Sequence, residues 1–145
     1  MFNRKDFILR KKGILSEEDC KRIIRYFETN QTEHKAGTFG GGMKRHTDRN
    51  AGEYAVSLCL SKDGNYPLYF ERTSGKVKAY ELDPGDLVLY HGIEWPHWRP
   101  KYKGRRHIQA FLCYVDKNGQ YTEHKMDGRA GLMYPPREGS FLYAK

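Results

Sequence analysis

The chain has 145 residues, enough for one domain with a buried core but too few for two domains of ordinary size. Hydrophobic residues make up 38% of it and aromatic residues 14%, which excludes a disordered polyelectrolyte. The formal net charge of +8 favours acidic partners, nucleic acid among them, but does not by itself identify one.

Three cysteines, Cys20, Cys59 and Cys113, lie far apart without a C-x-x-C pair, so neither a zinc knuckle nor a disulfide framework is indicated. The N-terminus lacks an apolar stretch followed by a cleavage site, and no run approaches the roughly 18 apolar residues of a membrane span. We therefore expect a cytoplasmic protein without a membrane segment. A monomer is the simplest assembly, although an exposed edge strand could pair.

Residues 14–29 carry the sequence pattern of a helix. Ser16 can cap it, the acidic residues that follow suit the positive end of the helix dipole, and Leu15 can pack onto Cys20. Apolar residues then recur at i, i+3, i+4 and i+7, which predicts one buried stripe and makes Cys20 a core residue. The stripe consists of Cys20, Ile23, Ile24 and Phe27.

From residue 53 the period changes to that of strands. Five short segments rich in β-branched and aromatic residues are separated by turn sequences, with no helical pattern between them. They are 53–61, 66–72, 76–82, 86–92 and 106–115. They predict a mainly β fold with a flanking helix, an antiparallel sandwich or small barrel of the jelly-roll type. We expect one domain over 1–145: a helical part at about 14–29, a β core at about 43–116 and a C-terminal extension over 117–145.

His46 and Asp48 form a His-x-Asp pair in "KRHTDRN". In an extended chain these side chains point to the same side, so an imidazole nitrogen and a carboxylate oxygen could reach one metal ion. Alone, the pair also fits a charged loop, and a third ligand is needed to decide. His97 is the best candidate because it follows the strand at 86–92 through a proline-fixed stretch, and His91 is the runner-up. Two imidazoles and one carboxylate would form the facial triad of non-haem Fe(II) oxygenases.

The chain resembles the 2-oxoglutarate and Fe(II)-dependent dioxygenases, prolyl hydroxylase-like branch, over about residues 7–116. The resemblance is carried by the order and spacing of "LSEEDCKRII", "HTD", "YAVSLCLS", "DPGDLVLYHG", His97 and "GRRHIQAFLCYV". It implies a double-stranded β-helix, a cupin-like jelly-roll core, with iron held by His46, Asp48 and His97. It also implies Fe(II) as cofactor, 2-oxoglutarate and O2 as co-substrates, and release of succinate and CO2 as a substrate C–H bond is hydroxylated.

In that family an arginine past the second histidine binds the distal carboxylate of 2-oxoglutarate. Arg106, nine residues after His97, matches this position best, because a guanidinium can hold a carboxylate with two hydrogen bonds. Arg99 is the rival, since it lies two residues from His97 and shares its side of the chain. Ser57 and Cys59 lie on the strand expected to face the cofactor and could shape its pocket.

Several alternatives stay open at this stage. The substrate is expected to be a peptidyl residue, as in prolyl hydroxylases, or a small molecule. The basic charge and the arginines near residue 105 favour oxidation of nucleic acid instead. A β-barrel binding module without catalysis, and a hydrolytic zinc site built from the same triad, also fit the pattern. The aromatic residues Trp95, Trp98 and Tyr102 could line a substrate groove or stack on a base, or could simply pack. We interpret the glycines of residues 37–42 as a flexible approach to the site.

Overall fold

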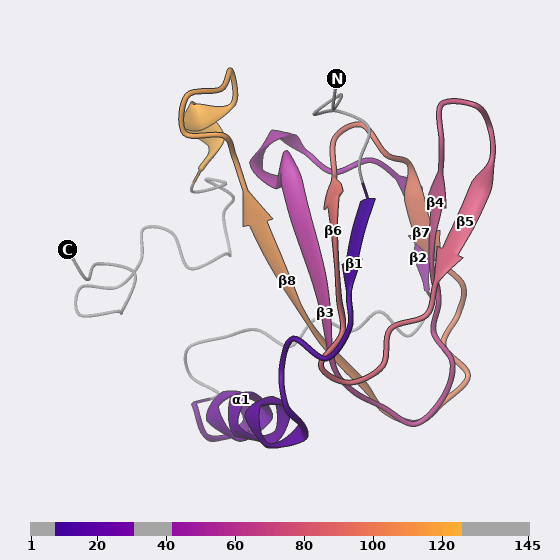
Figure 1. The fold of residues 1–145 in the computed structure, drawn as a ribbon, viewed down its shortest axis with the longest axis vertical. Helices are drawn as coiled ribbons and strands as arrows, with labels where there is room; N and C mark the ends of the chain where they lie inside the picture. Colours follow the sequence, from indigo (N-terminus) through magenta and orange to yellow (C-terminus); the bar gives the residue numbers. More distant parts are fainter. Residues whose placement is uncertain (1–7, 31–41, 126–145) are drawn as a thin grey trace.

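The computed structural model describes residues 8–30 and 42–125, which form two four-stranded antiparallel sheets and one flanking helix (Figure 1). The first sheet has the order β1-β6-β3-β8 and the second has the order β2-β7-β4-β5. In chain order the elements are β1 (Ile8–Lys11), α1 (Glu17–Thr29), β2 (Met43–His46), η2 (Asn50–Gly52), β3 (Tyr54–Lys62), β4 (Leu68–Glu71), β5 (Val77–Tyr80), β6 (Leu87–His91), β7 (His97–Arg99), β8 (His107–Tyr114) and η3 (Thr122–His124). This arrangement is a jelly-roll core and confirms the predicted fold class.

Helix α1 begins where the sequence predicts. The Ser16 hydroxyl accepts from the backbone N–H of Asp19, and the Asp19 carboxylate accepts from the backbone N–H of Ser16, a reciprocal capping box. The helix lies against the outside of the first sheet, where Cys20, Ile23 and Ile24 meet side chains of β3, β6 and β8. Phe27 is the exception to the predicted stripe, since it is 45% exposed.

Strand alternation separates two apolar layers. On β3, Val56, Leu58 and Leu60 face α1. Their neighbours Ala55 and Cys59 face the interior between the sheets, where they belong to a cluster that includes Phe70 and Tyr90. The side chains between the sheets are therefore the ones that can line a site inside the barrel.

All five predicted strands are present, and the structure adds three that the sequence pattern did not indicate. β1, β2 and β7 have only three or four residues each. The predicted glycine stretch at 37–42 lies outside the described residues except for Gly42, and the extension is described only as far as 125. Among the described residues no helix is long and apolar enough to cross a membrane.

Candidate metal centre

Two neighbouring strands of the second sheet bring together the three residues predicted as metal ligands. His46 ends β2 and His97 begins β7, and the two are paired in the antiparallel register. Asp48 follows two residues after His46 and reaches the same point. One ligand atom from each of the three lies within 4.8 Å of the other two.

The geometry of the three side chains suits a divalent cation. The Nε2 atoms of His46 and His97 each lie 3.5 Å from Oδ1 of Asp48. Metal–ligand bonds of about 2.1 Å at octahedral or tetrahedral angles would place ligand atoms roughly 3.0 to 3.4 Å apart. The two imidazole–carboxylate separations therefore need only a small contraction to close on an ion, whereas the two imidazole nitrogens, within 4.8 Å of each other, have farther to move.

Hydrogen bonds to the backbone orient both imidazole rings. Nδ1 of His46 lies 2.8 Å from the carbonyl oxygen of Lys44, and Nδ1 of His97 lies 2.8 Å from that of Trp95. Because a carbonyl oxygen only accepts, Nδ1 carries the hydrogen in a neutral ring, and Nε2 keeps its lone pair. Each lone pair thus faces Asp48, as a metal ligand requires.

The backbone around Gly92 holds Asp48 in place. The N–H of Asp48 donates to the carbonyl oxygen of Gly92 at 2.8 Å. A Cβ atom on Gly92 would collide with the Asp48 carboxylate and with the Gly52 carbonyl, so only glycine fits here. The sequence did contain this glycine, at the end of the strand predicted at 86–92, but nothing in the pattern tied it to Asp48.

The metal centre has a closed wall and an open side. The His97 side chain is 1% exposed and packs against the rings of Tyr90 and Phe70, at centroid distances of 4.9 and 5.8 Å. The His46 side chain is 39% exposed. A substrate would therefore approach from the His46 side, while the aromatic wall fixes the His97 ring.

Arg99 lies on the same strand as His97 and also points between the sheets. It is 4% exposed, and it donates to the Tyr66 carbonyl and the Ser57 hydroxyl, both at 3.2 Å. Its guanidinium lies over the Tyr66 ring at 4.7 Å, and Nε has no hydrogen-bond partner among the described residues. Within the described part of the chain no carboxylate forms an ion pair with it, and both of its hydrogen-bond partners are neutral. Desolvation by burial lowers the pKa of Arg99 from its ordinary value.

Other polar groups share this interior. His107 on β8 packs against the rings of Tyr66 and Tyr102, and the buried Gln109 Oε1 atom has no hydrogen-bond partner in residues 8–30 and 42–125. Burial, with a smaller contribution from Arg99, lowers the pKa of His107 to about 4, so its imidazole is neutral near pH 7. Burial likewise raises the pKa of Cys59 to about 11, which keeps it a thiol. Sequence reasoning gave no role to Tyr66, His107 or Gln109.

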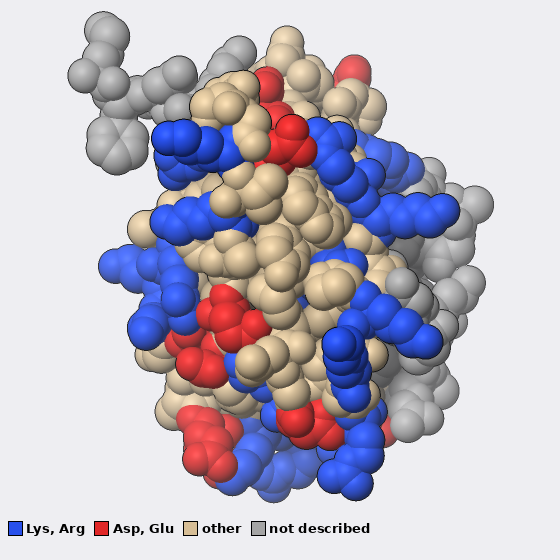
Figure 2. All heavy atoms as spheres, turned by 90° about the vertical axis from the view of Figure 1, so that its right-hand side faces the viewer, with Lys and Arg blue, Asp and Glu red and all other residues tan. Residues whose placement is uncertain are grey.

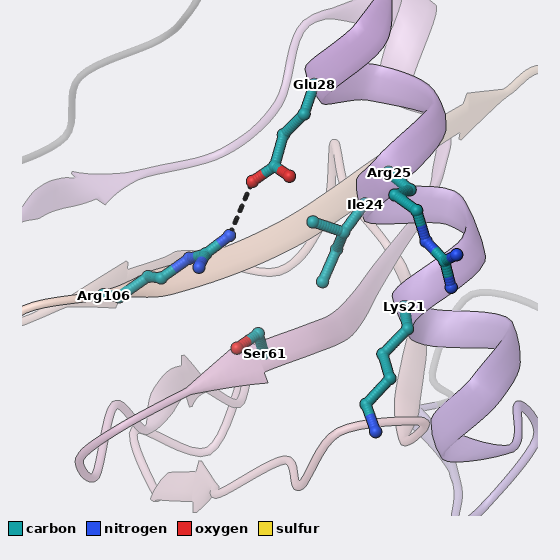
Figure 3. Close-up of a pocket in the computed structure, with 6 residues that line it drawn as sticks. All are labelled: Lys21, Ile24, Arg25, Glu28, Ser61 and Arg106. Atoms are coloured by element: carbon teal, nitrogen blue, oxygen red, sulfur yellow. Dashed lines mark hydrogen bonds and ion pairs between the residues drawn. The ribbon is translucent and has the colours of Figure 1, made fainter.

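Arg106 points away from this interior. It lies one residue before β8, and its guanidinium pairs with Glu28 of α1 at 2.7 Å in a surface cleft (Figure 3). Its side chain is 56% exposed. The structure therefore brings Arg99 and Ser57 together and leaves Arg106 on the helix side of the first sheet.

The remaining candidates occupy other positions. His91, the runner-up ligand, is buried against the Tyr54 ring, outside the group of three. Tyr102 donates to Asp63, which also accepts from the backbone of the turn before β8 and so fixes that turn. Trp95 is buried in the core, whereas Trp98 stacks on Tyr69 on the opposite face of its strand from His97.

Comparison with known proteins supports the fold. No protein-family model and no curated protein matches the sequence. Among solved structures, the chain is similar to a prolyl-4-hydroxylase of Pseudomonas putida, with a TM-score of 0.58 and 12% sequence identity. The similarity covers 72% of this chain and 89% of that one. The fold is thus that of a prolyl hydroxylase-like jelly roll, with a His-Asp-His group able to hold a metal.

Proposed function

We propose that this protein is an Fe(II)- and 2-oxoglutarate-dependent dioxygenase that hydroxylates a C–H bond and releases succinate and CO2. The observation that carries the proposal is the orientation of His46, Asp48 and His97: two imidazole lone pairs and one carboxylate oxygen converge from two paired strands. Three protein ligands on one side leave positions free for a co-substrate and O2. Bound Fe(II) would supply the activation of O2, coupled to decarboxylation of 2-oxoglutarate.

The buried cation supports 2-oxoglutarate as the co-substrate. We assign its distal carboxylate to Arg99 and not to Arg106, because Arg99 is enclosed without a carboxylate partner and retains an unpartnered Nε. The Ser57 hydroxyl, which accepts a hydrogen bond from Arg99, lines the same pocket, and Cys59 contributes a neutral thiol. A carboxylate arriving here would form charge-assisted hydrogen bonds in a nearly dry environment.

The residues around the metal ligands would also exclude water and hold the ligands in position. The Tyr90 and Phe70 rings exclude water from the His97 side, and the two backbone carbonyls keep both Nε2 atoms aimed inward. The open His46 side leaves room for a substrate, a peptidyl residue as in prolyl hydroxylases or a small molecule. Nucleic acid oxidation by the same chemistry is a second candidate, favoured by the distribution of charge described below.

An anaerobic titration tests the proposal. Fe(II) and 2-oxoglutarate added together without oxygen should give a visible charge-transfer band, and admission of O2 should yield succinate. His46→Ala and Asp48→Ala should remove both signals, whereas Arg25→Ala on α1, which lies against the outside of the first sheet, should leave them unchanged. Absence of both signals in the wild type, with the protein folded by circular dichroism, would refute the dioxygenase assignment. Hydrolysis that depends on zinc would support the hydrolytic alternative.

A further inference from the structure

The positive charge of the described chain is concentrated on the second sheet. The segments 42–46, 68–80 and 97–103, which contain β2, β4, β5 and β7, carry eight Lys and Arg residues and one acidic residue, Glu71. The rest of the described chain carries twelve Lys and Arg and thirteen Asp and Glu. The excess therefore comes from this one sheet.

Seven of the eight cations are exposed, since only Arg99 is buried. They are Lys44, Arg45, Arg72, Lys76, Lys78, Lys101 and Lys103. Arg45 pairs with Glu71 at 2.7 Å, and no other of the seven forms an ion pair within the described residues. Figure 2 shows this side of the molecule, with Lys and Arg side chains on both sides of an uncharged strip.

Aromatic rings lie on the outer face between these charges. Tyr69 of β4 and Trp98 of β7 are paired across the two strands, and their rings stack at 5.6 Å with planes only 10° apart. Both residues are half-buried, while their neighbours Phe70, His97 and Arg99 point inward. The next strand places the small Ala79 opposite Tyr69, which leaves the edge of the aromatic pair uncrowded.

We propose that the outer face of the second sheet binds single-stranded nucleic acid. Exposed cations neutralise phosphates, and a half-buried aromatic pair at the surface can stack with bases whatever their sequence. A duplex presents no base faces for stacking, and an acidic peptide would use the cations but not the rings. We call this surface, Tyr69 and Trp98 with the exposed cations other than Lys78, the basic sheet face. Lys78 is left out because it lies opposite the inward-pointing Phe70 and packs on the Tyr80 ring.

The basic sheet face shares its strands with the metal centre. Trp98 lies between His97 and Arg99 on β7, and Arg45 precedes His46 on β2. A nucleic-acid strand bound across the sheet would pass beside the exposed His46 side of the metal centre. Nucleic-acid binding does not depend on the proposed dioxygenase activity. Only the further step, in which the bound nucleic acid presents a base to the metal, rests on that activity.

Fluorescence anisotropy with labelled 20-nucleotide single strands of DNA and RNA, on the metal-free full chain, tests the proposal. The logarithm of affinity should fall linearly with the logarithm of salt concentration, with a slope of about −0.7 for each phosphate neutralised. Trp98→Ala should weaken binding about 5- to 100-fold, the range expected for loss of one stacked base, while Trp98→Phe should retain most of it.

Matched charge variants locate the surface. Lys76→Ala with Lys101→Ala should reduce the salt slope by about 1.4, whereas Lys21→Ala with Arg25→Ala, which removes the same charge from α1, should change it by less than about 0.5. The proposal is overturned if single strands do not bind, or if the α1 variant loses as much as the sheet variant. It is also overturned if Trp98→Ala and Trp98→Phe both bind single-stranded nucleic acid as tightly as the wild type does. A polyglutamate peptide that displaces the nucleic acid, and that binds Trp98→Ala as well as the wild type, would likewise overturn it.

Discussion

Replacement of Arg99 by methionine separates a ligand-binding role from a structural one. If Arg99 holds the distal carboxylate of 2-oxoglutarate, the pair is buried, and loss of one partner from a buried pair costs about 3 to 5 kcal/mol. At 1.4 kcal/mol for each tenfold change, the Kd for 2-oxoglutarate should rise roughly 100- to 5,000-fold. Arg99→Lys keeps the charge but loses the planar guanidinium that can form two parallel hydrogen bonds, so we expect the Kd for 2-oxoglutarate to rise by about tenfold.

The same substitution should hardly affect the folded protein without its co-substrate. The Arg99 side chain makes two hydrogen bonds to neutral groups and has no acidic partner in the described residues, so its desolvation is poorly compensated. An apolar side chain of similar length removes that penalty while leaving the Tyr66 carbonyl and the Ser57 hydroxyl unpaired. We expect the free energy of unfolding to change by no more than about 1 kcal/mol.

Thermal unfolding in the presence of Fe(II), without oxygen, measures both effects. At 100 times its Kd, 2-oxoglutarate should stabilise the wild type by about 2.7 kcal/mol, and Arg99→Met should lose this gain. Arg106→Met is the matched control, because its exposed pair with Glu28 contributes at most about 1 kcal/mol and should leave Kd within about twofold. The assignment is refuted if Arg106→Met abolishes the stabilisation and Arg99→Met preserves it.

Three further outcomes follow from local contacts. Gly92→Ala should lower metal affinity about 10- to 100-fold, because the added Cβ displaces Asp48. Gly64→Ala, where an added Cβ meets only ordinary contacts, should leave metal affinity unchanged. Isothermal titration calorimetry with Co(II) measures both affinities. Unfolded His107 binds a proton near pH 6.5 but folded His107 only near pH 4, so stability should fall as pH drops through this window. Urea unfolding at pH 7 and 5 should show a smaller fall for His107→Gln, and an equal fall would contradict the assignment to this residue. Ser16→Ala should cost about 1 kcal/mol in urea unfolding at pH 7, because it removes one half of the capping box, and Ser74→Ala in the β4–β5 turn is its control.

Sequence reasoning predicted the elements whose signals are local. The Ser16 cap and the alternation of β3 depend on neighbouring residues, and both appear in the structure. β2 and β7 were missed because their residues gain order from pairing with each other across the fold. The pairing of β2 with β7 also places His46 next to His97. The sequence could therefore predict the candidate ligands but not their proximity.

The proposal of Arg99 in place of Arg106 rests on which face of β8 lies inside. Ile108 and Ala110 are the apolar residues of the alternation, and they face α1, while polar His107 and Gln109 face the interior. In most sheets the apolar face marks the core, but β8 reverses this rule, because α1 covers its apolar face while its polar face lines the part of the interior that contains Arg99. Arg106 shares the parity of Ile108, so alternation directs it to the helix side. Arg99 shares the parity of His97, so any strand arrangement that buries the metal ligand also buries Arg99.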